Sequence, residues 1–283
     1  MADSPTDPNM RRWRLMRRGA FALGLVSGMS RAVSGQGTGP IGSPVGSPLS
    51  SATPSSQQLT AVTVAPGDSA LRAQRLAAGT QVFALTLFRD GDEIPVGRLR
   101  DVLVHDSSAA APVLRRTLTT ERGTLQLTDS TDSAEPGLAP LRRRSQQQNR
   151  RVLLEFVGRR VRGSLAPQDV PGVPIDTTLP VAAFDAGNWD LVLRALPLAV
   201  GYAAQFAAYD VDAGVRRYQV QVTGQTTLHG EAAWVVKLVI GRGRESYVWI
   251  GKETARLLQL ETMLNESTML RQVLLPATTE RAR

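Results

Sequence analysis

The sequence of 283 residues contains no cysteine, only two histidines and few aromatic residues (5%). Without cysteine there is no disulfide framework, no thiolate chemistry and no lipid-modified cysteine anchor. The two histidines, His105 and His229, lack the spacing of a zinc site, and we expect neither a metal nor another cofactor. Lysine is almost absent as well, since Lys237 and Lys252 are the only two, so arginine supplies nearly all the positive charge.

The net charge of +8 is concentrated at the start of the chain. The first 31 residues hold +4 of it, through six arginines against Asp3 and Asp7. The charge that remains is ordinary for a chain of this length. Aromatic residues interleaved with the arginines, which would stack on bases, are missing, so we expect no nucleic-acid partner.

The N-terminal region has the three parts of a secretory signal peptide. Residues 11–18 form a basic block, residues 19–29 an apolar run, and residues 32–35 a stretch of small side chains. The apolar run is too short for a permanent transmembrane helix, which needs about 20 residues. We therefore predict a signal peptide over residues 1–35 and a periplasmic or secreted bacterial protein. An amphipathic or buried N-terminal helix is the alternative.

The next segment is rich in glycine, serine, proline and threonine. Such a composition cannot bury enough apolar surface to offset the entropy lost on ordering, so residues 36–67 are predicted to be a disordered linker. Residues 276–283 are expected to be a disordered tail. Residues 68–275 then form a single folded domain.

The last third of the chain, residues 202–275, predicts antiparallel β-hairpins. Tyr218, Val220 and Val222 alternate with polar residues, and glycine-containing turns separate successive runs. Shorter alternating runs occur at residues 81–89, 96–105, 112–118, 124–128, 151–157 and 160–165. The four prolines of residues 167–180 indicate an extended crossing segment rather than a core strand.

Two short helices are predicted within this domain, at residues 68–78 and 188–196. The second is the clearer, because Trp189, Val192 and Leu196 are spaced along one face and Pro197 ends it. The fold class is therefore mainly β, an antiparallel curled sheet of roughly ten strands with one or two short helices.

No combination of residues in the sequence forms a recognisable catalytic site, and the protein is predicted not to be an enzyme. His105 and Asp106 are adjacent but have no activated nucleophile, so we expect His105 to be a solvated turn residue. Asp176 and Asp185 lie in segments faintly like the loops of aspartic proteases, but nine residues are too few to separate two lobes. We interpret Asp176 as a turn residue and Asp185 as the entry to the second helix.

A concentration of arginines in the middle of the chain is the remaining charge feature. The candidate patch for an anion or a partner protein consists of Arg142, Arg143, Arg144, Arg159 and Arg160. The alternative is that alternate arginines line the solvent face of a hairpin and protect an edge from pairing.

Several segments carry a resemblance to a known family. Residues 247–261, YVWIGKETARLLQLE, resemble the Trp-containing hairpin of periplasmic proteins related to the lipoprotein carriers LolA and LolB. They resemble more closely an exported bacterial family of unknown function related to those carriers. Residues 224–240, 138–141 and 151–163 are similar to other segments of that family, and the similarity spans residues 71–275. Gly251 departs from the pattern, since the family hairpin usually has Asp there.

The resemblance implies a half barrel around a short helix, with a concave apolar face that holds a lipid or another apolar ligand. Its candidate lining residues are Trp189, Phe206, Trp234, Tyr247 and Trp249. Two alternatives stay open at this point. The protein could be a structural or interaction module that docks another envelope protein through basic hairpins, or an enzyme of unrecognised type.

Overall fold

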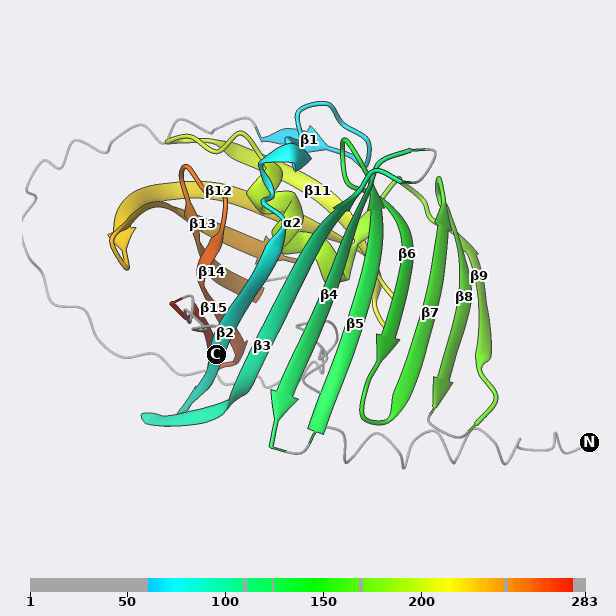
Figure 1. The fold of residues 1–283 in the computed structure, drawn as a ribbon, viewed down its shortest axis with the longest axis horizontal. Coiled ribbons are helices and arrows are strands. Elements are labelled where there is room, and N and C mark those ends of the chain that lie inside the picture. The colour runs from blue at the N-terminus through cyan, green and yellow to red at the C-terminus, as the bar shows by residue number, and fades with distance from the viewer. Residues whose placement is uncertain (1–60, 109–110, 124, 168–169, 242–243, 277–283) are drawn as a thin grey trace, which may run out of the picture.

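The computed structural model describes residues 61–108, 111–123, 125–167, 170–241 and 244–276. This part of the chain forms one sheet of 16 strands that is curled but not closed (Figure 1). The strands are β1 (Val62–Val64), β2 (Gly79–Arg89), β3 (Asp92–Asp106), β4 (Val113–Arg122), β5 (Leu125–Ala134), β6 (Ala139–Gln146), β7 (Arg150–Val157), β8 (Arg160–Pro167), β9 (Val173–Thr178), β10 (Phe184–Asp185), β11 (Ala203–Asp210), β12 (Gly214–Leu228), β13 (Glu231–Ile240), β14 (Arg244–Gly251), β15 (Leu257–Asn265) and β16 (Thr268–Leu274).

The strand order follows the chain in two blocks joined by a single long-range pairing. The order is β1-β11-β12-β13-β14-β15-β16-β2-β3-β4-β5-β6-β7-β8-β9, with β10 paired beside β11. All neighbours are antiparallel except β1 and β10, which run parallel to β11. The pairing of β16 with β2 brings the end of the domain back to its beginning. The predicted mainly β, curled antiparallel sheet is confirmed, and the additional strands extend it.

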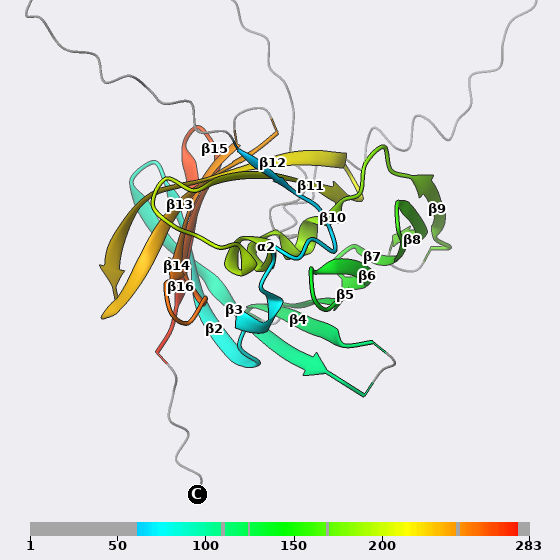
Figure 2. The same cartoon turned by 90° about the horizontal axis from the view of Figure 1, so that it is seen from above.

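The helices lie inside the curl rather than outside it. They are the 3-10 turns η2 (Ala73–Arg75) and η3 (Ala186–Asn188) and the α-helix α2 (Trp189–Ala195). Seen from above, α2 lies between the strands β11–β14 on one side and β3–β5 on the other (Figure 2). Every residue of α2 is buried. Among the described residues, no helix has the length and apolar character needed to cross a bilayer.

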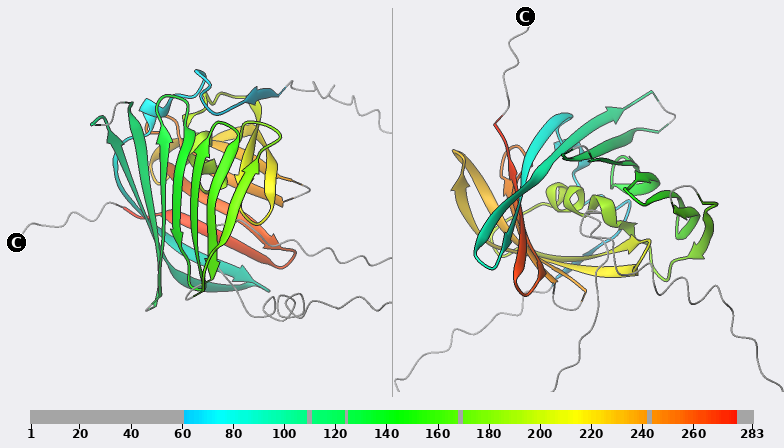
Figure 3. Two further views of the ribbon diagram at one scale, coloured as in Figure 1. Left: turned by 90° about the vertical axis from the view of Figure 1, so that its right-hand side faces the viewer. Right: turned by 90° about the horizontal axis from the view of Figure 1, so that it is seen from below.

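The inner faces of the two sides of the curl differ in chemistry. We call β11–β16 and β2 the apolar wall, because their inward side chains form the main hydrophobic core with α2. Buried members of that core include Phe83, Phe206, Val220, Val236, Leu238, Val248, Ile250 and Leu260. We call β3–β6 the polar wall, since its inward positions include charged and hydroxyl side chains. These strands stand side by side with β7–β9 in Figure 3.

The two ends of the sheet meet through side chains and not through backbone pairing. Residues of β7 and β8 pack with Tyr209 of β11 and with Leu179 and Ala183 in a second, smaller core. Phe156 and Tyr209 make an edge-to-face aromatic pair there, with ring centroids 6.2 Å apart. Arg150 and Asp212 form an ion pair across the same boundary, at 2.6 Å. We call this boundary the seam.

Several local predictions were wrong, each for a physical reason. The helix predicted at residues 68–78 is only the turn η2, because the Arg72 N–H donates to the Ala195 carbonyl and leaves the local helical pattern. β1 lies within the predicted linker, since its residues pair with β11. Asp176 is a strand residue of β9 rather than a turn residue, and it pairs with Arg160. The predicted signal peptide and most of the linker and tail lie outside the described residues.

Candidate functional site

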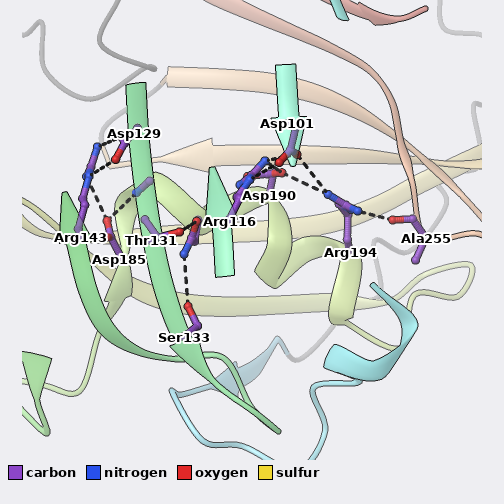
Figure 4. Close-up of polar contacts among 12 residues, drawn as sticks. Asp101, Arg116, Asp129, Thr131, Ser133, Arg143, Asp185, Asp190, Arg194 and Ala255 are labelled. Atoms are coloured by element: carbon purple, nitrogen blue, oxygen red, sulfur yellow. Dashed lines mark hydrogen bonds and ion pairs between the residues drawn. The ribbon is translucent and has the colours of Figure 1, made fainter. Parts of the chain in front are cut away.

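The most unusual feature of the interior is a set of charged side chains between α2 and the polar wall. Arg116 and Arg143 are only 4% and 5% exposed, although arginine is almost never fully buried unless it is paired. Each occupies an inward position of its strand, so period-2 alternation carries it to the core side of the sheet. Figure 4 shows the two clusters that they form with aspartates of the wall and of the helical segment.

The first cluster joins β3, β4 and α2, and we call it the four-member cluster: Asp101, Arg116, Asp190 and Arg194. Arg116 donates to both carboxylate oxygens of Asp101, from Nε at 2.9 Å and Nη2 at 2.8 Å. It also donates to both oxygens of Asp190, from Nη1 at 2.6 Å and Nη2 at 2.8 Å. One guanidinium therefore connects the wall to the helix by two bidentate pairs.

Arg194 completes this cluster and extends it to the opposite wall. Its Nη1 lies 3.8 Å from Asp190 and 3.9 Å from Asp101. Its Nε donates to the carbonyl of Ala255, in the turn between β14 and β15, at 2.7 Å. Asp190 and Arg194 are one helical turn apart, so α2 presents both toward the charges of the polar wall. Two arginines and two aspartates balance in charge.

The environment sets the protonation of this cluster. Burial alone would raise the pKa of Asp190, but the charge and hydrogen bonds of Arg116 outweigh it and hold that pKa below its usual range. Burial would likewise lower the pKa of Arg116, and Asp101 and Asp190 reverse this, so that the pKa is raised. For Arg194 burial prevails, and its pKa is lowered despite the two aspartates. Asp190 is accordingly ionised at neutral pH.

The second cluster, the three-member cluster, consists of Asp129, Arg143 and Asp185. Arg143 donates from Nε and Nη2 to Asp129, at 3.1 and 2.5 Å, and from Nη1 to Asp185 at 3.1 Å. Asp185 also accepts from the Gly187 N–H at 2.8 Å, which caps the turn leading into α2. Its role as the helix-entry residue is therefore confirmed. Its other oxygen, Oδ2, is buried, and no group among the described residues donates a hydrogen bond to it.

A neutral contact lies between the two clusters. Thr131 Oγ1 donates to Asn188 Oδ1 at 2.9 Å, and Asn188 Nδ2 donates to Ser133 Oγ at 3.3 Å. Both hydroxyls come from inward positions of β5. The segment that leads into and forms α2 is thus tied to the polar wall at Asp185, Asn188 and Asp190, while its apolar side chains pack in the main core.

Both aspartates are buried, but their neighbouring charges make the protonation of Asp185 different from that of Asp190. Burial raises the pKa of Asp185, and Arg143 offsets this only in part because Asp129 adds like charge. Burial would lower the pKa of Arg143, but Asp185 and Asp129 reverse this and keep it protonated. A raised folded-state pKa contributes stability below about pH 4, the unfolded value, and that contribution is lost as pH rises through the folded value.

This difference leads to an expected pH effect of the substitution Asp185→Asn. The neutral amide keeps an oxygen for Gly187 and Arg143 but cannot ionise, so the penalty for a buried carboxylate disappears at higher pH. We expect the variant to become more stable relative to the wild type as the pH rises from 4 to 8. Urea unfolding across that range measures it. Parallel stability curves for the two proteins would contradict it.

The structure separates the five predicted lining residues into two groups. Trp189 and Phe206 are buried in the main core, and Trp234 packs against it from an inward position opposite Ile250. Tyr247 and Trp249 lie on the convex outer face, so their prediction as concave-face liners was wrong. Tyr247 is opposite Lys237, and Trp249 is opposite Val235, while the inward positions of β14 are taken by Val248 and Ile250.

The predicted arginine patch is also divided, between the interior and the surface of the protein. Arg143 was predicted to be at the surface and is instead buried in the three-member cluster, because it alternates with its exposed neighbours Arg142 and Arg144. Arg159 and Arg160 are exposed at the turn between β7 and β8. Arg159 donates to the Pro180 carbonyl at 3.1 Å. Ser145, two residues further along β6, is buried on the same side, but a serine gives no hydrophobic signal that would identify the inward position of Arg143 in the sequence.

His105 is not the solvated turn residue that was predicted. Its Nδ1 lies 2.5 Å from Glu135 Oε1, and its Nε2 lies 2.6 Å from the Leu76 carbonyl, where it donates. The contact with Leu76 holds the segment after η2 against the end of β3, and the contact with Glu135 links β3 to the turn between β5 and β6. Across the described part of the chain, no group of three histidine, cysteine or acidic side chains could hold a metal ion.

Glu231 explains how the hairpin tolerates glycine at position 251. A side chain at Gly251 would meet the Glu231 carboxylate, which accepts from Thr254 Oγ1 and pairs with Arg256 at 2.6 Å. A carboxylate from the neighbouring strand therefore fills the space beside this turn. An aspartate at position 251 would compete with it for the same space.

Comparison with known proteins identifies a family for this chain. Residues 83–271 match the model of a family described as a protein of unknown function, DUF3108. No curated protein matches the chain. The matched region runs from β2 to β16 and contains both charged clusters together with α2. Because the match covers well over half of the sequence, the chain belongs to the DUF3108 family.

Proposed function

We propose that the protein is an exported, non-enzymatic envelope protein that binds a lipid or another apolar ligand on the inner face of its curled sheet. The observation that carries this proposal is that a short helix covers the inner face of the apolar wall. That wall presents mainly apolar side chains inward, interrupted by the hydrogen-bonded pair Ser246–Thr262 and by Gln272. In the interior the main element packed on it is α2, a helix of seven residues. Inner apolar surfaces with few polar groups are what acyl chains require.

The connection that holds α2 has the properties of a displaceable cover. Residues 179–202, which we call the covering segment, run from the end of β9 to the start of β11 and cross the seam. Within it, only the two residues of β10 join the sheet. The rest is held by side chains and by single backbone contacts, such as the Leu179 N–H on the Arg159 carbonyl at 2.8 Å.

The charged clusters give this cover a defined closed position. Ion pairs require fixed geometry, whereas apolar contacts tolerate sliding, so Asp185, Asp190 and Arg194 specify where α2 rests. Binding energy from an apolar ligand would have to exceed the cost of separating these pairs. A ligand that binds only the opened form shifts the population toward it by its differential affinity.

The sequence resemblance to the lipoprotein carriers LolA and LolB supports the same ligand class. The predicted signal peptide supports a location outside the cytoplasm, where lipids in transit need a protein carrier. Trp189, Phe206 and Trp234 belong to or pack against the main core on the inner side of the sheet, and this supports an apolar ligand on that side.

Tryptophan quenching tests this proposal, because the structure supplies an inner and an outer reporter. One form keeps only Trp234 (W13F, W189F, W249F), and its matched control keeps only Trp249 (W13F, W189F, W234F). We expect brominated stearic acid to quench Trp234 and to leave Trp249 unchanged, with unbrominated stearic acid as the blank. The physical reason is that bromine quenches by contact, and only Trp234 faces the interior.

Native mass spectrometry of the purified chain gives the complementary measurement. A bound lipid that co-purifies and is exchanged by stearic acid is the expected result. Repeated recovery of empty protein, together with equal quenching or no quenching in the two tryptophan forms, would contradict the proposal.

A further inference from the structure

A strongly basic surface covers the outer side of three neighbouring strands. Alternation turns five arginines of β6, β7 and β8 outward, and we call this set the outer basic face: Arg142, Arg144, Arg151, Arg160 and Arg162. The acidic residues among or beside them are Glu155, which lies opposite both Arg142 and Arg162, Asp132 of β5, which lies opposite Arg142, and Asp176 of β9. Five guanidinium groups and three carboxylates leave a local charge of +2.

Two of the five arginines contact a carboxylate, and three do not among the described residues. Arg160 forms a bidentate pair with Asp176, both bonds being 2.8 Å, and Arg162 lies 3.7 Å from the same carboxylate. Within the residues that the structure describes, Arg142, Arg144 and Arg151 have neither a hydrogen bond nor an ion pair from their side chains. Their guanidinium groups are therefore available to anions in solution.

Exposed aliphatic side chains lie among the arginines. Leu153 is 49% exposed and lies opposite Arg144, and Val157 is 75% exposed and lies opposite Arg160. Phosphate binding alone does not use these aliphatic groups. Guanidinium groups beside aliphatic groups match the boundary between lipid headgroups and acyl chains.

We propose that the outer basic face docks the protein on the surface of a membrane that contains anionic lipids. The arginines bind lipid phosphates, for which their planar donor pattern is suited, while Leu153 and Val157 enter the interfacial layer. This inference goes beyond ligand binding on the inner face, because it rests only on the outer side chains of β6–β8.

Vesicle sedimentation with the full chain tests the docking. All forms carry R11S, R12S, R14S, R17S and R18S, so that the N-terminal basic block does not contribute. Vesicles of phosphatidylcholine alone are compared with vesicles that also contain phosphatidylglycerol. We expect binding only to the anionic vesicles, and about a hundredfold weaker binding when R142S, R144S and R151S are combined, since each arginine near such a surface contributes roughly a factor of five.

A matched control removes the same charge elsewhere. Arg72, Arg89 and Arg217 are exposed on other parts of the molecule, and replacing these three by serine lowers the net charge equally. We expect this control to change binding by less than about threefold, because charges beyond a Debye length are screened. Equal losses in the two triple variants, or failure of the parent chain to bind anionic vesicles, would overturn the proposal.

A second pair of measurements distinguishes a membrane from an acidic protein as the partner of the outer basic face. L153S combined with V157S leaves the charge unchanged and is expected to weaken vesicle binding severalfold, as buried aliphatic groups are lost. The same variant should bind soluble poly-glutamate as the parent does. Tighter binding of poly-glutamate than of anionic vesicles would overturn the proposal and indicate that the partner is an acidic polypeptide. Neither result depends on the quenching of Trp234, which uses a soluble fatty acid.

Discussion

Replacing Asp190 by asparagine is expected to destabilise the fold by about 3–5 kcal/mol, the range for breaking a buried ion pair from one side. Both oxygens of Asp190 accept from Arg116, and Arg194 lies 3.8 Å away, so the variant leaves two buried guanidinium groups with Asp101 as their one remaining carboxylate. The NH2 group of the asparagine would also face a donor group of Arg116, where no hydrogen bond can form. Urea unfolding of the two proteins at pH 7 measures the difference.

The exposed pair Arg160–Asp176 supplies the control for this substitution. Its geometry is bidentate like that of Arg116 and Asp190, but both side chains are about half exposed. Asp176→Asn is therefore expected to leave the free energy of unfolding nearly unchanged. Similar losses in D190N and D176N would mean that burial does not determine the strength of these pairs.

Asp190 also gives a pH dependence of known sign. Its pKa is lowered in the folded state, so its stabilising contribution is present above about pH 4 and is lost as pH falls through the folded value. The difference between the wild type and D190N should therefore shrink in acid. This is the opposite of the trend expected for Asp185, whose pKa is raised.

The hairpins of the apolar wall could be predicted because their inner and outer positions differ in polarity. Tyr218, Val220 and Val222 are inward and buried, and the residues between them are outward and polar. β6 gave no such contrast, since residues 142–146 of its sequence APLRRRSQ are polar on both sides of the sheet. A strand whose inward residue is an ion-paired arginine cannot be told from a loop by hydrophobic alternation alone.

The face of β14 could not be predicted for the opposite reason. Tyr247, Val248, Trp249 and Ile250 are all apolar, so alternation does not choose between the two sides. The register decides it, because Val248 lies opposite Val236 and Leu260, both in the main core. Trp234 and Trp249 therefore look equivalent in the sequence but report on opposite faces of the sheet.

The helix α2 was predictable as a helix but not as the link between two walls. Its spacing of Trp189, Val192 and Leu196 indicates one apolar face, which does pack in the main core. Arg116, the partner of Asp190, is 74 residues earlier in the chain, and Asp101, which lies 3.9 Å from Arg194, is also on a distant strand, so nothing local indicates either of them. Long-range charge pairing of this kind depends on the curl of the sheet, which brings β3 and β4 against the helix.

Replacing Arg143 by methionine is expected to cost about 3–5 kcal/mol, whereas the same change at Arg144 should have almost no effect. Arg143 makes three hydrogen bonds to Asp129 and Asp185, and methionine makes none, so two buried carboxyl groups lose their partner. Arg144 has an exposed side chain on the other face of the same strand. Two adjacent positions with the same residue type and the same substitution differ only in which side of the sheet they occupy.

The pH dependence of R143M distinguishes the loss of charge pairing from a simple packing defect. Without Arg143 the pKa of Asp185 has no nearby positive charge to lower it, so the folded state favours the protonated acid more strongly than before. Protonation relieves the burial penalty, and the loss caused by R143M should therefore be larger at pH 8 than at pH 5. A packing defect would give the same loss at both values, and equal losses in R143M and R144M would show that the three-member cluster does not hold the entry to α2 in place.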